Sequence, residues 1–211
     1  PQRVMELASE MGRLYDIEKL TLFRACECYE ALEAAGKVEP DALIFVNSIA
    51  SVSLNDEDWA SFCTAHKAIL PKLVVEITEE EEMDEQALEK KRNASGAPTV
   101  FALDDYGSGY SNGSSLLTIA PRYVKVDIAI IRGIDADPDK QQFLKALIEY
   151  ARPRGVQVLA EGVEMMNDLR RVLEMGVDLL QGYGLARPAA EPVAIREKAA
   201  RVIEETARRD A

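Results

Sequence analysis

The 211-residue sequence has little histidine, cysteine or positive charge, and each shortage excludes a class of function. One histidine, His66, leaves almost nothing for a Ser-His triad or a site built on a histidine pair. Cys26, Cys28 and Cys63 lack the second Cys or His cluster of a zinc site, so we expect buried thiols. Lys plus Arg number 25 against 37 Asp plus Glu, a formal charge of −12, which argues against binding a nucleic-acid polymer through bulk positive charge.

Long apolar runs are also missing. No run approaches the roughly 20 residues that cross a bilayer, and residues 1–14 carry acids and lack a signal-peptide profile. We therefore expect a cytoplasmic protein with no membrane segment in this chain. A hydrophobic content of 47% is too high for disorder and predicts a sizeable core. The length favours one domain over residues 1–211, because barrels commonly use about 200 to 250 residues in a single domain.

Short apolar runs rich in Val and Ile alternate along the chain with stretches of helical periodicity. The expected strands are Ala42–Asn47, Leu73–Thr78, Thr99–Asp105, Tyr123–Asp127, Gln157–Val163 and Leu179–Leu185. The expected helices are Leu14–Ala35, Asp56–Lys67, Asp84–Lys91, Lys140–Ala151, Asn167–Glu174 and Pro192–Arg208. Strands covered on both faces read as nearly continuous apolar runs, so the alternation predicts an α/β fold with a parallel sheet and right-handed crossovers.

Polar side chains stand at the carboxyl end of every expected strand. In chain order they are Asn47, Glu76, Asp104 with Asp105, Lys125 with Asp127, Glu161 with Glu164, and Gln181. The carboxyl ends of the strands of a parallel barrel converge on one face, where active sites are built. A polar residue at one strand end is often incidental, but six strands in succession favour a shared site.

Several carboxylates in one site repel each other unless a cation neutralises them. Because the donors are oxygens without His or Cys, we expect Mg²⁺ or Mn²⁺ rather than Zn²⁺. Asp104 and Asp105 would face opposite sides of a regular strand, a constraint that relaxes where the loop Tyr106–Gly113 begins. Two such ions can clamp a phosphodiester and activate a water, which would let this acidic chain accept a phosphate.

Lys125 and Glu161 each have two interpretations. Lys125 either places a positive charge beside the phosphate or the attacking water, or is satisfied by its neighbour Asp127. Glu161 is either a general base or only a metal-binding carboxylate.

Together these residues resemble the motifs of EAL domains, the bacterial cyclic-di-GMP phosphodiesterases. The resemblance covers about Pro1 to Pro188 and rests on Asn47, Glu76–Glu79, Asp104–Ser111, Lys125–Asp127, Ala160–Glu164 and Gln181–Tyr183, in this order and separation. It implies a modified TIM (β/α)8 barrel that uses two Mg²⁺ or Mn²⁺ ions to cut one phosphodiester of cyclic di-GMP, giving linear pGpG. Tyr106 and Ser108, where the family often has Phe and Thr, preserve the chemistry.

The resemblance also implies roles for single residues. Asn47, Glu76 and Asp104 would be metal ligands, with Asp104 bridging and Asp105 and Glu161 serving the second ion. Lys125 would hold or polarise the attacking water, Glu161 would be the candidate base, and Gln181 would orient the metal-bound water. Glu79 would anchor the loop after Asp105, and Asp127 and Glu164 would be supporting acids. The implied partners are cyclic di-GMP, a second copy in a homodimer, and an adjoining sensor or GGDEF domain in the full protein.

One departure is the glutamate of the Glu-Ala-Leu motif, a metal ligand that we do not find at a strand end before Asn47. Glu30-Ala31-Leu32 has the right letters but lies inside an expected helix, too close to Asn47 for a helical crossover. Six expected strands against the eight of a barrel indicate that the first two are absent. We therefore expect an N-terminally truncated domain with weakened or lost activity.

Two alternatives remain open. The first is a degenerate, non-catalytic cyclic-di-GMP receptor, although the visible ligand set is intact. The second is a lyase or isomerase of the enolase kind, which also uses strand-end acids on Mg²⁺ and a lysine base, but nothing in the sequence suggests a pocket for its carboxylate substrate.

Overall fold

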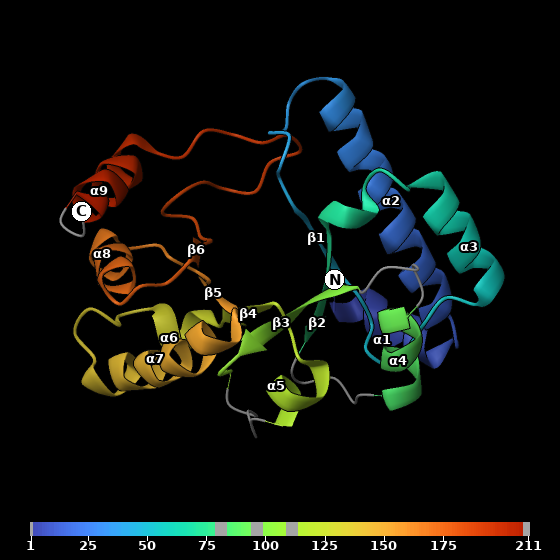
Figure 1. Cartoon of the computed structure of the whole chain (residues 1–211), viewed down its shortest axis with the longest axis horizontal. Helices are drawn as coiled ribbons and strands as arrows, with labels where there is room; N and C mark the ends of the chain where they lie inside the picture. The colour runs from blue at the N-terminus through green and yellow to red at the C-terminus, as the bar shows by residue number, and fades with distance from the viewer. Residues whose placement is uncertain (1, 79–83, 94–98, 109–113, 209–211) are drawn as a thin grey trace. The chain divides into compact units, whose positions relative to one another are not determined.

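The computed structural model describes residues 2–78, 84–93, 99–108 and 114–208, and the chain divides into two compact units, Pro1–Ala102 and Leu103–Ala211 (Figure 1). The described strands follow one another in a six-stranded sheet in the order β1-β2-β3-β4-β5-β6. The pairs β1–β2, β4–β5 and β5–β6 are parallel. The predicted α/β class with a parallel sheet and helical crossovers is confirmed.

The first unit carries its helices before and between its strands. Its elements are α1 (Gln2–Glu10), α2 (Leu14–Ala34), β1 (Ile44–Asn47), α3 (Asp56–Ala65), the 3-10 helix η1 (Leu70–Lys72), β2 (Leu73–Thr78), α4 (Glu85–Asn93) and the start of β3 (Val100–Tyr106). The parallel register pairs Ile44 with Leu73 and Asn47 with Glu76. The last residue of β1, Asn47, therefore lies beside Glu76, two residues before the end of β2.

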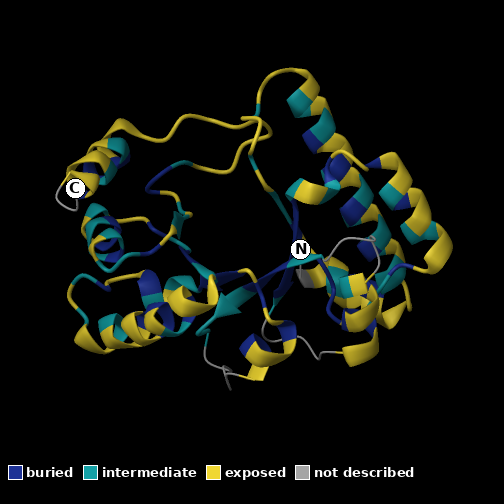
Figure 2. Cartoon of the chain, in the orientation of Figure 1, coloured by how far each residue is buried: buried dark blue, intermediate teal, exposed yellow. Residues whose placement is uncertain are grey.

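The core of the first unit is the strand β2, whose residues from Leu73 to Ile77 are all buried. In Figure 2 the helices α2 and α3 carry both buried and exposed positions. The side chain of Asn55 accepts from the backbone N–H of Asp58 over 2.8 Å, so it caps the start of α3. Asp58 in turn accepts from Tyr15 at 2.5 Å and from Lys19 at 2.7 Å, which joins α3 to α2.

The second unit continues the alternation. Its elements are the rest of β3, α5 (Ser114–Ile119), β4 (Tyr123–Val126), α6 (Ile128–Ile131), α7 (Pro138–Ala151), the 3-10 helix η2 (Arg152–Arg154), β5 (Gln157–Ala160), α8 (Met166–Glu174), β6 (Leu179–Leu180) and α9 (Glu197–Ala207). Every residue of β4 is buried, and the register pairs Lys125 with Leu159. The carboxyl ends of β4 and β5 are therefore level with each other.

Strand β2 has the bounds expected from the sequence, but the last two strands are shorter than expected. Strand β5 ends at Ala160 rather than Val163, and β6 ends at Leu180 rather than Leu185. Gly162 has a φ of 61°, which turns the chain out of the extended conformation. The apolar runs continue past both strands because Val163 and Leu185 are buried in the loops that follow.

Other expectations from the sequence were wrong in part. The short helices α1, α5 and α6 were not expected. Of the three cysteines expected to be buried, only Cys26 is; Cys63 is half-buried and Cys28 is exposed. Glu30-Ala31-Leu32 lies inside α2, as expected. Among the described residues, no helix combines the length and the apolar character that crossing a membrane requires.

Candidate functional site

The second unit brings two consecutive acids together at the end of β3. Asp105 has a φ of 55°, a left-handed conformation that non-glycine residues adopt rarely. This turn breaks the alternation of a regular strand, and the backbone N–H of Asp105 donates to Oδ1 of Asp104 over 3.1 Å. The left-handed backbone at Asp105 thus lets both carboxylates lie within 4.8 Å of each other, as expected from the sequence.

A buried lysine from the neighbouring strand joins this pair to a third acid. Nζ of Lys125 donates to Oδ1 of Asp104 over 2.7 Å and lies 3.0 Å from Oε1 of Glu161. Glu161 directly follows β5, and its backbone N–H donates to the carbonyl of Val126 over 3.0 Å. Lys125 is only 5% exposed, so its ammonium is held by these acids rather than by bulk water.

The three acids form a candidate cation site. One carboxylate oxygen from each of Asp104, Asp105 and Glu161 lies within 4.8 Å of the others. Burial raises the pKa of Glu161 to about 7, and the charges of Asp104 and Asp105 act in the same direction against the opposing effect of Lys125. A divalent cation would relieve this crowding of negative charge, and oxygen donors without nitrogen or sulfur suit Mg²⁺ or Mn²⁺.

The first unit holds the other two proposed ligands. Asn47 at the end of β1 is the register partner of Glu76, which lies two residues before the end of β2, and the backbone N–H of Ser48 donates to the carbonyl of Glu76 over 2.9 Å. Glu76 is buried and Asn47 is exposed. The predicted site residues therefore gather as one pair in the first unit and as one cluster in the second.

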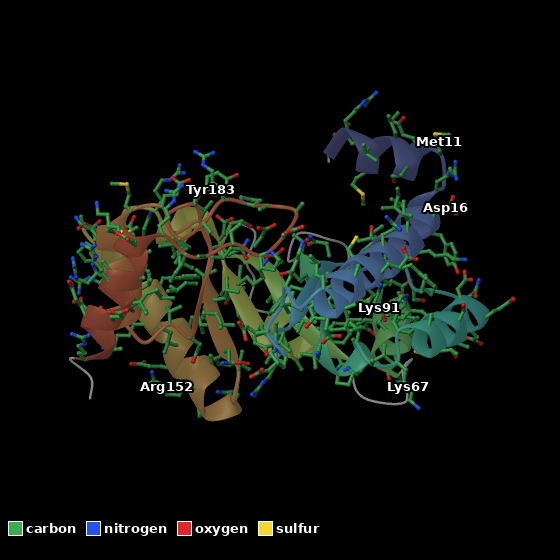
Figure 3. All side chains as sticks on the ribbon, turned by 90° about the horizontal axis from the view of Figure 1, so that it is seen from above. Met11, Asp16, Lys67, Lys91, Arg152 and Tyr183 are labelled. Atoms are coloured by element: carbon green, nitrogen blue, oxygen red, sulfur yellow. The ribbon has the colours of Figure 1, made fainter. Side chains whose placement is uncertain are left out.

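A groove of about 700 Å³ in the second unit contains two further predicted residues, Gln181 and Glu164. Its wall includes Tyr183, which is 48% exposed, with the Arg187 guanidinium 5.1 Å from the ring centre. Tyr183 is labelled in Figure 3. Glu164, another lining residue, pairs with Arg132 over 3.1 Å. Sequence reasoning gave no role to Tyr183 or Arg187, although Tyr183 stands in the Gln-Gly-Tyr motif and only 6% of the chain is aromatic.

Two predicted supporting acids have simpler surroundings. The side chain of Asp127 accepts from the backbone N–H of Ala129 over 2.7 Å, which caps α6. Lys125 pairs with Asp104 and Glu161, so the simple interpretation that Asp127 alone satisfies it is not supported. Glu79 and the loop from Gly109 to Gly113 lie outside the described residues.

A parallel α/β fold whose strands carry acids, an amide and a lysine toward their carboxyl ends belongs to the class of barrel-type folds, in which sites are built at that face. Within that class, the family model described as the EAL domain matches residues 1–188. The chain belongs to the EAL domain family, as the motifs indicated.

Curated relatives support this assignment over most of the chain. Cyclic di-GMP phosphodiesterase NbdA of Pseudomonas aeruginosa is 30% identical over 194 residues, which cover 89% of this chain and 24% of that protein. Probable cyclic di-GMP phosphodiesterase PdeG of Escherichia coli is 32% identical over 118 residues, or 55% of this chain and 23% of PdeG. The chain thus spans about a quarter of the length of these relatives.

Solved structures show the same fold. The cyclic-di-GMP-bound standalone versatile EAL protein from Vibrio cholerae has a TM-score of 0.73 at 22% identity, covering 92% of this chain and 84% of that one. The manganese and cyclic-di-GMP complex of BlrP1 from Klebsiella pneumoniae has a TM-score of 0.67 at 22% identity, covering 85% of this chain and 47% of that one. The predicted modified barrel of the EAL type is therefore confirmed as the fold class.

Proposed function

We propose that this chain carries the catalytic part of a metal-dependent phosphodiesterase that hydrolyses cyclic di-GMP to linear pGpG. The observation that carries the proposal is the cluster of Asp104, Asp105 and Glu161 around the buried Lys125. Relatives named cyclic di-GMP phosphodiesterases support the substrate and the reaction class.

We assign the metal to the oxygen donors at the strand ends. Asn47, Glu76 and Asp104 would hold one Mg²⁺ or Mn²⁺, and Asp105 and Glu161 would serve a second, with Asp104 shared. The donor chemistry fits, because three carboxylate oxygens already lie within 4.8 Å of one another. When bound, such ions lower the pKa of a coordinated water and neutralise charge on the phosphate.

The chain's own residues then have separable tasks. Lys125 holds Asp104 and Glu161 in place and offers positive charge to a phosphate oxygen. Glu161 takes the proton of the attacking water, because its carboxylate lies beside Asp104, Asp105 and Lys125 at the candidate cation site. The oxygen of the water forms the new bond to phosphorus and the bond to the 3′-oxygen breaks, so the product carries a 5′-phosphate and a 3′-hydroxyl.

The groove beside Gln181 is proposed to take a guanine base of the substrate. Tyr183 offers an exposed aromatic face for stacking, and Glu164 offers an acceptor for the guanine N–H groups. Gln181 is proposed to orient metal-bound water, with Asp127 and Glu164 as supporting acids. Homodimer formation, an adjoining sensor or GGDEF domain, a single domain over residues 1–211 and a cytoplasmic location remain predictions.

The test is hydrolysis of cyclic di-GMP followed by chromatography, with added Mn²⁺ and with EDTA. We expect pGpG to form only with the metal, and Glu76→Ala or Asp104→Ala to abolish its formation. Lys145→Ala is the control, because its side chain is 64% exposed on α7. Undiminished hydrolysis in EDTA would contradict the two-ion proposal.

A non-catalytic cyclic-di-GMP receptor is the second candidate. A receptor would need only the groove lined by Gln181 and Tyr183 to hold the nucleotide, without the metal-dependent step. A receptor would bind cyclic di-GMP in calorimetry and show no pGpG after prolonged incubation with Mn²⁺. The same pair of measurements therefore separates the two functions.

A further inference from the structure

The first unit contains a buried polar cluster around the residues that directly follow β1. Glu18 of α2, Ser48 after β1, and Lys91 of α4 are 1%, 6% and 5% exposed. Oε1 of Glu18 accepts from the Ser48 hydroxyl over 2.5 Å and is also bonded by Nζ of Lys91. Nζ of Lys91, labelled beside α2 in Figure 3, also donates to the Ser48 hydroxyl over 2.7 Å.

The second oxygen of Glu18 reaches the backbone. Oε2 accepts from the N–H of Ile49 over 2.8 Å, so one carboxylate binds the side chain of Ser48 and the main chain of the next residue. From the other side, the N–H of Ser48 donates to the carbonyl of Glu76 over 2.9 Å. The segment directly after Asn47 is therefore held between α2 and β2.

Stability alone is a weak reason for such a cluster. Two buried charges lose their hydration, and replacing a buried ion pair by apolar residues of similar volume is often neutral or stabilising. A carboxylate that accepts three hydrogen bonds in fixed directions does something that an apolar side chain cannot do. It sets the position of the segment to which it bonds.

We propose that Glu18 is a positioning residue that holds Asn47 beside Glu76, so that the affinity of this strand-end pair for a divalent cation depends on Glu18. This inference rests on the proposed function, in which Asn47 and Glu76 bind the metal. Lys91 neutralises the charge of Glu18. Ser48 is bonded to Glu18 and directly follows Asn47 in the chain, so the position of Asn47 depends on Glu18.

The experiment measures Mn²⁺ affinity of the full chain by electron paramagnetic resonance of the free ion, without substrate. The first variant is Glu18→Leu with Lys91→Met, which removes the buried charges together and leaves the net charge unchanged. We expect it to fold and to bind Mn²⁺ about tenfold more weakly, the size of loss found when groups that orient metal ligands are removed.

The second variant is Glu18→Gln with Lys91→Met. The side-chain amide oxygen at position 18 can still accept from the backbone N–H of Ile49. We expect its Mn²⁺ affinity to lie within about threefold of the original, because one hydrogen bond to the segment remains. Asp58→Asn is the matched control, since it weakens another carboxylate–lysine contact of α2 in the same unit. We expect it to lower the thermal stability and to leave the Mn²⁺ affinity unchanged.

The proposal is overturned if the leucine pair binds Mn²⁺ within twofold of the original, or if both pairs lose affinity equally. If the leucine pair does not fold, Glu18→Met with Lys91→Met decides, because methionine is as long as glutamate but accepts no hydrogen bond from Ser48 or Ile49, and an unchanged affinity contradicts the inference. Glu76→Ala distinguishes failure of the positioning role of Glu18 from failure of the proposed metal site. If Glu76→Ala also keeps full Mn²⁺ affinity, the metal assignment itself is wrong.

Discussion

The backbone N–H of Asp105 donates to the carboxylate of Asp104 over 3.1 Å, and Asp105 itself has a φ of 55°. A left-handed residue with a Cβ costs about 1–2 kcal/mol, which glycine avoids. We expect the free energy of unfolding of Asp105→Ala, measured in urea, to be about 1 kcal/mol lower than that of Asp105→Gly. Both should lose Mn²⁺ affinity, because both lack the carboxylate. Equal urea stability of the two would show that the turn carries no strain.

Asp105→Asn separates the turn from the charge, since asparagine tolerates the left-handed conformation. We expect this variant to unfold within about 0.5 kcal/mol of the original chain, as substitutions without a disruptive mechanism do. Its Mn²⁺ affinity should fall with that of Asp105→Gly. Full Mn²⁺ affinity in Asp105→Asn would remove Asp105 from the ligand set.

Glu161 gives the metal-free chain a specific pH dependence. Its folded pKa of about 7 lies above the usual value of 4.5, so its contribution favours folding below pH 4.5 and is lost as pH rises through 7. Relative to Glu161→Gln, the original chain should lose on the order of 1 kcal/mol between pH 4.5 and 8, after allowance for solvent screening. Thermal unfolding in EDTA measures the difference. Glu149→Gln, an exposed carboxylate on α7, is the control and should show no such trend.

Lys125→Met leaves the surrounding acids without their buried cation. Removing one partner of a buried ion pair costs about 3–5 kcal/mol, so we expect a large loss of stability in EDTA that added Mn²⁺ partly restores. Lys125 normally lowers the pKa of Glu161, and its loss should move the pH midpoint of the Glu161 effect upward. Turnover should fall at least about 100-fold while cyclic-di-GMP binding is largely kept. Equal losses of binding and turnover would make Lys125 a substrate anchor instead.

The sequence predicted the fold class and the bounds of β2 well, for a physical reason. Buried parallel strands need nearly continuous apolar runs, and the run from Leu73 to Thr78 is bounded by polar residues on both sides. The same rule overextended β5 and β6, because Val163 and Leu185 are buried in loops, and a buried loop residue is as apolar as a strand residue.

The cluster behind Asn47 could not have been predicted in the same way. Glu18 lies in a helix among Asp16 and Lys19, where an acid normally faces water, and no periodicity marks it as 1% exposed. Its partners Ser48 and Lys91 are far apart in the chain. Only the packing of α2 and α4 behind β1 shows that these three residues meet.

Tyr183 tests the groove as the site of a guanine base. We expect Tyr183→Ala to weaken cyclic-di-GMP binding about tenfold, since base–aromatic stacking is worth about 1–3 kcal/mol, and Tyr183→Phe to keep most of it. Tyr150→Ala is the matched control, because Tyr150 also lies under an arginine, with Arg154 4.0 Å from its ring centre. Equal binding by Tyr183→Ala and the original chain in calorimetry would exclude the groove as a base site.

At Gly182, which lines the groove, the backbone closely approaches Val163 in the loop after Glu161. A Cβ at this position would lie 2.3 Å from the backbone N and O of Val163, so any side chain must push Gln181 and the loop after Glu161 apart. Gly133 is the matched control, since it has a φ of 76° and nothing within 4 Å of its Cβ position. Gly133→Ala should cost only about 1 kcal/mol of conformational strain. Gly182→Ala should cost about 1–3 kcal/mol for overpacking in addition, and it should lower turnover, whereas Gly133→Ala should not. If both variants kept full turnover, the spacing between Gln181 and the loop after Glu161 would have no part in the reaction.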